Sequence, residues 1–437
     1  MLKRFLRPSS PEGSEGRSKP SSRYLVRPVT VAELRQLIPL RNLDEEELQA
    51  FSLSQEVETY GRGSVLFARG ERDSSVLFLL TGKVRIKLKD EQGYLVEGGT
   101  ARANFPLSHM DRHMATAVAV TDVELVRIPE GVMHKNFEAR LEDDKILDPE
   151  SWEVAARIRA LPLFQAFCQH LVEDSLQLPT LSDLALRLRK AVEKENIGVA
   201  EAARIVEMDA TIATKLVHVA NSPLYHSSAP ARNCLEAVNR LGLKATCSLV
   251  VTLCLKDAFK GCDRLIERKM QELWRENLQV SALSYVLAKE NHWPDPEEAL
   301  LMGLISDIGL VPFLVFAGQF PREHRPPQDI NDICASIRGP ASCYVLRKWN
   351  FPEELVNIPM LAEMWNYDSG PQLSLSDIVM LSKLHRQLEK GRMQDLPSIN
   401  SLPACGKLLD GSLTAEYSLK VLHDARDHIR SILNTLQ

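Results

Sequence analysis

The stretch that most constrains the fold of this chain is residues 178–255, where turn signals separate apolar runs of helical length. Four segments mark it, in this order: Leu178-Pro179-Thr180-Leu181, Met208-Asp209-Ala210-Thr211, Lys215–Pro223 (KLVHVANSP) and Ala237–Gly242 (AVNRLG). No run in this stretch alternates apolar and polar side chains as a half-buried strand does. The pattern predicts helices, and from about Asp143 onward the whole chain reads as helical.

Later helices follow from the same reasoning. A long amphipathic pattern predicts a helix over 262–290, and Pro294–Glu298 restarts a helix because proline is tolerated in a first turn. Further helices are predicted near 331–349, 352–366, 374–390 and 414–436, with a loop at 317–330.

The chain before residue 140 has a different pattern, with short β-prone runs separated by glycine turns. Val84, Ile86 and Leu88 alternate with basic residues, which is typical of a half-buried strand. Thr30 and Glu33 have the spacing of a capping box, so a helix is expected there. A second short helix is expected from Asn42 or Asp44, and many short strands favour a small barrel or jelly roll.

The predicted fold class is therefore multidomain α+β, a β-barrel or jelly roll with flanking helices followed by an all-α domain. The predicted divisions are a disordered tail (1–28), the barrel (29–140), a helical linker (141–175), the helical domain (176–390) and a C-terminal loop and helix (391–437). The tail is rich in Ser, Pro, Gly and basic residues and lacks the apolar surface that offsets ordering entropy.

Composition narrows the function classes. The chain has 437 residues, a formal net charge of −5 and eight cysteines without CxxC spacing. Such cysteines indicate reduced thiols in a cytoplasmic protein rather than a disulfide framework or a zinc site. No apolar run is long enough to predict a membrane span, and the charge gives no reason to expect nucleic-acid binding. The histidine pairs His109/His113 and His423/His428 lack a third ligand nearby.

The four segments of residues 178–242 resemble the HDOD family. That resemblance implies a helical fold like that of metal-dependent HD and HD-GYP phosphohydrolases, in a form that has lost its metal ligands and become a signalling module. The run Leu300–Leu310 is similar to the HD helix, but the His-Asp pair is Ser306-Asp307, and Leu310 replaces the usual Lys.

The other metal ligands implied by the resemblance are also missing. Glu276 stands where the upstream His is expected, and no His occurs near Ala335 or in Met364-Trp365-Asn366. We therefore predict no catalytic residue, no metal and no cofactor, with Asp307 a capped or salt-bridged buried acid. The alternative is a residual phosphohydrolase in which Glu276 and Asp307 share one hard cation.

Residues 29–140 resemble a cyclic-nucleotide-binding domain. The matching pattern includes Tyr60-Gly61-Arg62-Gly63, Val65-Leu66-Phe67, Gly70-Glu71 and Gly82-Lys83-Val84. The family's phosphate-binding cassette has a Phe-Gly-Glu run and then an Arg before a strand of small residues.

Here Phe105 fits the cassette, but Pro106 and Leu107 replace the glycine and the acid. Arg112 is one position out of register, with His113 in its place. Each lost contact costs on the order of 1–3 kcal/mol, so weak or absent nucleotide binding is expected. The vestigial pocket would comprise Arg112, His113 and Thr116, and a working nucleotide sensor built on these residues is the alternative.

The segment Ala220–Tyr225 has two interpretations. Asn221 is expected to end a helix in a left-handed conformation, with Pro223 preventing its continuation. Alternatively, Tyr225 and His226 belong to a docking surface.

Together these features predict a bacterial, cytoplasmic, non-enzymatic signal-transduction protein. In it, a degenerate sensor barrel is coupled to a protein-interaction domain. The expected partners are other signalling proteins. Two further candidates are a small-molecule ligand in the barrel and a second copy of the chain.

Overall fold

The computed structural model describes residues 23–38, 40, 45–73, 75–88, 93–108, 113, 115–129, 147–152, 154–176, 178, 182–193, 197–222, 225, 230–261, 263–389, 396–397 and 402–408. The chain divides into two compact units. The first comprises Met1–Ala139, Asn366–Asp368 and Gly391–Lys407, and the second comprises Arg140–Trp365, Ser369–Lys390 and Leu408–Gln437.

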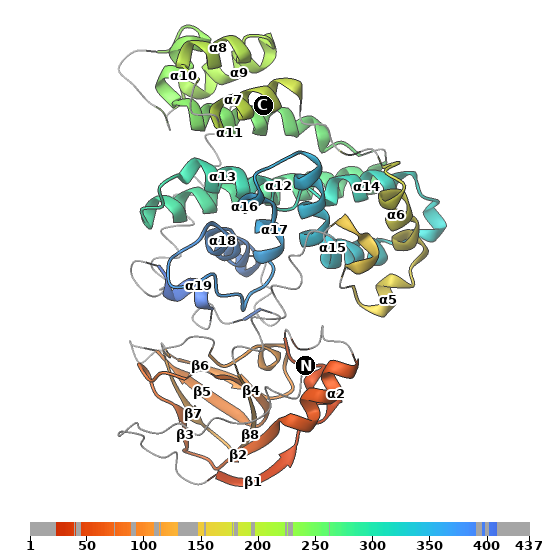
Figure 1. Ribbon diagram of the computed structural model, residues 1–437, viewed down its shortest axis with the longest axis vertical. Coiled ribbons are helices and arrows are strands. Elements are labelled where there is room, and N and C mark those ends of the chain that lie inside the picture. Colours follow the sequence, from red (N-terminus) through yellow and green to blue (C-terminus); the bar gives the residue numbers. More distant parts are fainter. Residues whose placement is uncertain are drawn as a thin grey trace. The chain divides into compact units, whose positions relative to one another are not determined.

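The first unit is built from two antiparallel four-stranded sheets, with strand orders β1-β2-β8-β4 and β3-β7-β5-β6 (Figure 1). The strands are β1 (Arg23–Pro28), β2 (Glu56–Tyr60), β3 (Val65–Phe67), β4 (Ser75–Thr81), β5 (Lys83–Lys87), β6 (Gly93–Glu97), β7 (Thr116–Ala119) and β8 (Val123–Pro129). The predicted jelly-roll-like barrel is confirmed. In β5, Val84 and Ile86 are buried while the alternating basic residues face outward, as their period of two requires.

Local sequence signals set the ends of several elements in this unit. Helix α1 (Val31–Leu34) begins with the predicted capping box between Thr30 and Glu33, and α2 (Glu45–Ser54) follows. Gly82 has a φ of +87°, and a Cβ there would lie 2.3 Å from the carbonyl oxygen of Asp122, so only glycine fits between β4 and β5.

The predicted tail extended too far into the ordered chain. Arg23–Pro28 forms β1 and pairs with β2, because apolar Tyr24, Leu25 and Val26 give this segment the β propensity that the rest of the tail lacks. Residues 1–22 of the predicted tail lie outside the described residues.

The second unit is helical. Its elements are η5 (Pro149–Ser151), α5 (Ala156–Arg159), α6 (Pro162–Val172), α7 (Asp183–Glu193), α8 (Val199–Val206), α9 (Ala210–Ala220), α10 (Cys234–Leu241), α11 (Leu243–Leu255), η7 (Lys256–Ala258), α12 (Arg264–Glu290), α13 (Pro296–Ile305), α14 (Leu310–Gln319), η8 (Arg322–His324), α15 (Pro327–Lys348), α16 (Glu353–Val356), α17 (Ile358–Leu361) and α18 (Leu375–Glu389). The long helix α12 packs against α13, α14 and α18 (Figure 1).

The predicted helices of this unit are present, with three corrections. The loop predicted over 317–330 is shorter, because α14 runs to Gln319 and α15 starts at Pro327. The single helix predicted over 352–366 is two short ones, α16 and α17, with Pro359 in the first turn of the second. The predicted linker 141–175 is no separate element, because Phe167 of α6 packs edge-on against Phe313 of α14 at 5.2 Å.

Two predicted elements cannot be followed in full. The helix predicted at 414–436 lies outside the described residues, as does most of the segment 391–437, in which α19 (Pro403–Gly406) is described.

One helical stretch, Pro296–Gln319, is long and apolar enough to cross a membrane by length and composition. Its most apolar window is 94% buried inside the protein, which is the behaviour of a core helix. The bent pair α10 and α11, which turns by 114°, also passes the test when counted as one span. This is weak evidence for a membrane segment.

Candidate functional site

The centre of the helical unit holds a buried network of charged side chains around Asp307. Asp307 lies in the turn between α13 and α14 and is 2% exposed. Its Oδ1 accepts a hydrogen bond from Nζ of Lys383 at 2.7 Å, and its Oδ2 accepts one from the guanidinium of Arg338. Lys383 also donates to Oε1 of Glu363 at 2.6 Å. Two cations and two carboxylates thus join α15, α18 and the segment after α17.

The charges of this network stabilise one another. Burial by itself would raise the pKa of Asp307, but Arg338 and Lys383 outweigh it and hold that pKa below its usual range. Burial would likewise lower the pKa of Lys383, whereas Asp307 and Glu363 raise it above its ordinary value. The pKa of Arg338 is raised, chiefly by Asp307. Asp307, Lys383 and Arg338 are therefore charged near neutral pH.

The structure places the residues predicted for the HD centre around this network. Ser306 is buried and donates a hydrogen bond to the carbonyl oxygen of Gly303 at 3.1 Å, which is a packing role. Glu276 of α12 contributes to the raised pKa of Arg338. Within the described part of the chain, no group of three or more His, Cys, Asp or Glu side chains could hold a metal ion.

The partners of Asp307 were not predicted from the sequence. Arg338 lies one helical turn after Ala335, and Glu363 directly precedes Met364, so both are beside positions where the resemblance implies a His ligand. The lone cation inside the apolar run Ile378–Leu384 was the available signal for Lys383, since a lysine in a buried helix face needs an anionic partner.

The structure describes two of the three residues predicted for the vestigial nucleotide pocket, His113 and Thr116. His113 is 1% exposed, its Nδ1 lies 2.7 Å from Oγ of Ser108, and its ring stacks on Phe67 at 4.1 Å. Burial lowers the pKa of His113. Thr116 instead accepts a hydrogen bond from the backbone of Arg69 at 3.1 Å. Arg112 lies outside the described residues.

Other cassette residues also pack inward. Leu107, in the position of the family's acid, is 4% exposed within the apolar core of the barrel. Its backbone nitrogen donates to the carbonyl oxygen of Leu77 at 2.8 Å, which fixes the segment against β4. Nε2 of His113 has no hydrogen-bond partner among the described residues. The segment thus fills the barrel with its own side chains.

Asn221 ends α9 as predicted, but the predicted left-handed conformation was wrong. Asn221 has φ −99° and ψ 2°, so it is not left-handed. Its side-chain amide instead closes the following loop: Nδ2 donates to the carbonyl oxygen of Ala231 at 2.9 Å, and Oδ1 accepts from the nitrogen of Ala231 at 2.7 Å. Arg240 also donates to Oδ1, at 2.9 Å. An amide that pairs with both backbone groups of one residue needs no unusual backbone angle at its own position.

Replacing Asn221 by Ala should lower the free energy of unfolding by about 1–2 kcal/mol, because three hydrogen bonds in a partly buried loop are lost. Urea denaturation of the full chain measures the change. Asn221→Asp keeps an oxygen at the position of Oδ1 but turns the Nδ2 donor into an acceptor that faces the carbonyl oxygen of Ala231, so it should lose stability as well. An Asn221→Ala protein as stable as the unmodified one would contradict the role of the amide.

Tyr225 lies on the same loop, and its side chain is in a buried environment. Its hydroxyl is buried without a hydrogen-bond partner in the described part of the chain, and burial raises its pKa. Glu297 in the first turn of α13 also raises that pKa. His226, the other residue named for the predicted docking surface, lies outside the described residues, so the docking interpretation stays a prediction.

Glu297 gives the helical unit a pH-dependent stability. Burial, aided by Asp295, raises the pKa of Glu297 to about 7, above its ordinary value of 4.5. The folded state therefore binds this proton more tightly than the unfolded state does. The stabilisation is complete below about pH 4.5 and is lost as the pH rises towards 7.

Over that range, the free energy of unfolding of the unmodified protein should fall, relative to that of Glu297→Gln, by on the order of 2 kcal/mol. Urea denaturation at several pH values tests this, with the exposed Glu201→Gln as control. Parallel pH profiles of the unmodified protein and Glu297→Gln would refute it.

Comparison with known proteins places both units. The HDOD domain family model matches residues 178–363. This range includes Asp307, Arg338 and Glu363, and Lys383 lies beyond its end. The helical unit therefore contains an HDOD domain. A second model, the cyclic nucleotide-binding domain, matches residues 57–140, so both predicted resemblances are confirmed.

Individual relatives are distant. A protein of Shewanella amazonensis SB2B, provisionally described as a metal-dependent phosphohydrolase, is 24% identical with a TM-score of 0.51, covering 62% of this chain and 97% of that one. An HDOD domain protein of unknown function from Geobacter sulfurreducens is 20% identical with a TM-score of 0.48, covering 61% and 96%.

An uncharacterised Treponema pallidum protein is 23% identical over 194 residues, 41% of this chain. The chain spans only 36% of the length of that curated relative. At 24% identity the Shewanella amazonensis structure shows the fold alone. The combination of an HDOD domain with a cyclic nucleotide-binding domain fits a signal-transduction protein.

Proposed function

We propose that this protein is a non-enzymatic, cytoplasmic component of bacterial signal transduction, and that its helical domain acts by binding other signalling proteins. The observation that carries the proposal is the position of Lys383 and Arg338 on the two carboxylate oxygens of Asp307. A divalent ion needs those oxygens as ligands, and here two protein cations already hold them.

Electrostatics supports the same conclusion. A metal ion entering beside Asp307 would meet the positive charges of Lys383 and Arg338, and the repulsion between like charges is strong in a buried site. Removing Lys383 and Arg338 would leave the buried carboxylate of Asp307 without a neutralising partner. The side chain of Lys383 is 4% exposed, and its positive charge neutralises Asp307 as a metal ion would in a metal-dependent HD enzyme.

The barrel has a docking or structural role in this proposal. Leu107 and His113 fill the region where a nucleotide would need an acid and a free cation, and Pro106 has no backbone donor to offer. Cyclic AMP and cyclic GMP should therefore bind weakly or not at all.

Three measurements on the full chain test the proposal. Elemental analysis and a phosphodiesterase assay should find neither a stoichiometric transition metal nor hydrolysis, and calorimetry should give no binding of cyclic AMP below millimolar concentration. About one Mn, Fe or Zn per chain, with activity lost in Asp307→Ala, would establish a phosphohydrolase instead. A low-micromolar dissociation constant for cyclic AMP, weakened in Arg112→Ala, would establish a nucleotide sensor.

The positive half of the proposal is tested by reciprocal affinity capture. A signalling protein that co-purifies with the tagged chain should capture the chain in return and should bind it as a purified pair. A tagged chain that captures only itself would reduce the interaction role to self-association, which size-exclusion chromatography with light scattering would detect.

A further inference from the structure

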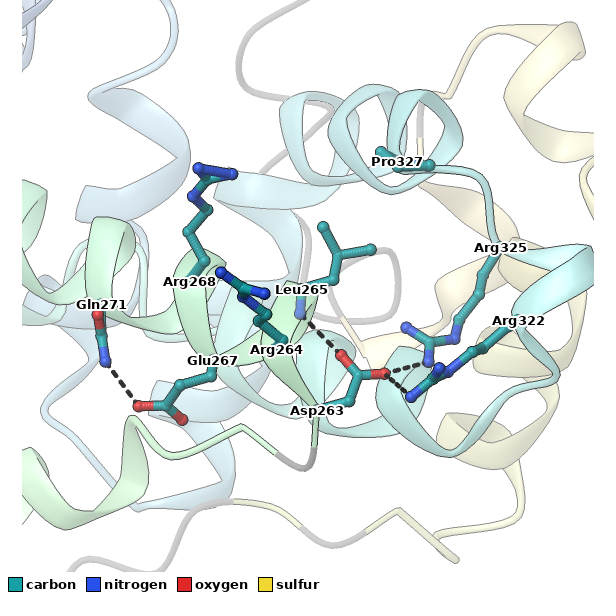
Figure 2. A pocket seen from close by; sticks show the side chains of 9 residues that line it. All are labelled: Asp263, Arg264, Leu265, Glu267, Arg268, Gln271, Arg322, Arg325 and Pro327. Atoms are coloured by element: carbon teal, nitrogen blue, oxygen red, sulfur yellow. Dashed lines mark hydrogen bonds and ion pairs between the residues drawn. The ribbon is translucent and has the colours of Figure 1, made fainter.

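A second, separate site is suggested by a pocket at the start of the long helix α12. The pocket has a volume of about 800 Å³, within the range of small-molecule sites. Its lining includes Asp263, Arg264, Glu267, Arg268, Arg322 and Arg325. Figure 2 shows Arg264 and Arg268 rising from α12 on one side of Asp263, while Arg322 and Arg325 reach Asp263 from the other side.

The two acids of the pocket are already engaged. Asp263 caps α12, accepting hydrogen bonds from the backbone nitrogens of Leu265 and Ile266 at 3.0 Å, and it is paired with buried Arg325. Glu267 accepts hydrogen bonds from the backbone of Gly261 at 2.6 Å and from Gln271 at 2.8 Å. Because Asp263 occupies the backbone donors of α12, the helix N-terminus itself offers little to a ligand.

Three guanidinium groups remain available to a ligand. Arg264 and Arg268 are exposed, and no described residue forms an ion pair with either. They are four residues apart on α12, where like charges repel each other. Arg322 is 80% exposed and has only a 3.8 Å contact with the already neutralised Asp263. Arg325 underneath is rigid, because its Nε donates to the carbonyl oxygen of Phe320 at 2.9 Å.

We propose that this pocket binds a small molecule carrying two linked phosphate groups. A guanidinium fork matches phosphate oxygens in a bidentate manner, and three forks on two sides of a pocket suit a diphosphate better than a single carboxylate. The volume of the pocket is larger than a diphosphate requires, and Leu265 and Pro327 line its apolar border. The site belongs to the helical unit alone and depends on neither the barrel nor the Asp307 network.

Calorimetric titration of the full chain with ADP and with inorganic pyrophosphate tests the proposal, with citrate as a multiply charged probe that lacks phosphate. ADP, pyrophosphate or both should bind, and citrate at least about tenfold more weakly. Tighter binding of ADP would identify a nucleotide as the source of the diphosphate, and equal binding would identify the diphosphate alone as the recognised group.

Arg264→Gln/Arg268→Gln should weaken binding by about tenfold or more with an unchanged Tm, because neither side chain has an intramolecular partner in the described chain. Arg275→Gln is the matched control, an exposed arginine further along α12 that does not line the pocket. Its affinity should stay within about twofold of the unmodified value. Absence of binding up to millimolar concentration, equal binding of citrate, or an unchanged affinity of the double variant would each overturn the proposal.

Discussion

Replacing Lys383 by Met should lower the free energy of unfolding of the helical unit by about 3–5 kcal/mol, the typical cost of removing one partner of a buried ion pair. Met has a similar volume and fills the space of the lysine stem, so the loss measures charge rather than a cavity. Without Lys383, Oδ1 of buried Asp307 loses its partner, and Glu363 loses a 2.6 Å hydrogen bond. Urea denaturation followed by circular dichroism gives the value.

Two controls make this result specific. Lys348→Met removes the same charge from an exposed pair, Lys348 with Asp174 at 2.8 Å, and should cost at most about 1 kcal/mol. Asp307→Asn in the Lys383→Met background removes the buried charge left behind and should recover part of the stability. If Lys383→Met costs no more than Lys348→Met, Asp307 does not depend on the ammonium group, and the argument that protein cations replace a metal fails.

The sequence was sufficient to predict that Asp307 is a buried acid, capped or salt-bridged, but not that it lies in a turn between α13 and α14 rather than within one helix, nor which residues pair with it. Apolar spacing located α12, α13, α15 and α18, and the Ser306-Asp307 pair indicated a buried acid. Which cations neutralise it is a question of tertiary packing: Arg338 is 31 residues away along the chain and Lys383 is 76. Helical periodicity constrains which face of a helix is buried, but it carries no information on which buried residues of different helices meet.

The barrel and the Asn221 loop show the same limit at short range. His113 has the register of a ligand-facing cation in the sequence, yet its ring is buried against Phe67. An Asn after a helix is compatible with a left-handed end or with an amide that bridges a loop, and the choice depends on Ala231, ten residues further on. In both places the residue type was informative and the direction of the side chain was not.

Gly309→Ala should destabilise the helical unit by at least about 3 kcal/mol, the upper end of the usual cost of overpacking. Gly309 has an ordinary helical φ of −63°, so backbone strain is not the reason. The reason is space. A Cβ at this position would lie 2.1 Å from the carbonyl carbon of Ala341 and 2.2 Å from the nitrogen of Ser342, both in the backbone of α15.

A backbone cannot rotate away as a side chain can, so the turn after α13 and helix α15 would have to separate. That separation would also stretch the 3.0 Å hydrogen bond from the nitrogen of Gly309 to Oγ of Ser342, and it would disturb Asp307 and Arg338, which lie on the same two segments. Gly198→Ala is the matched control, because a Cβ there meets no atom within 4 Å, and it should change the free energy of unfolding by less than about 1 kcal/mol. Urea denaturation of both variants measures the difference. If Gly309→Ala is as stable as Gly198→Ala, the turn and α15 do not approach each other this closely. The close packing of these two segments would then no longer explain how Arg338 is positioned on Asp307.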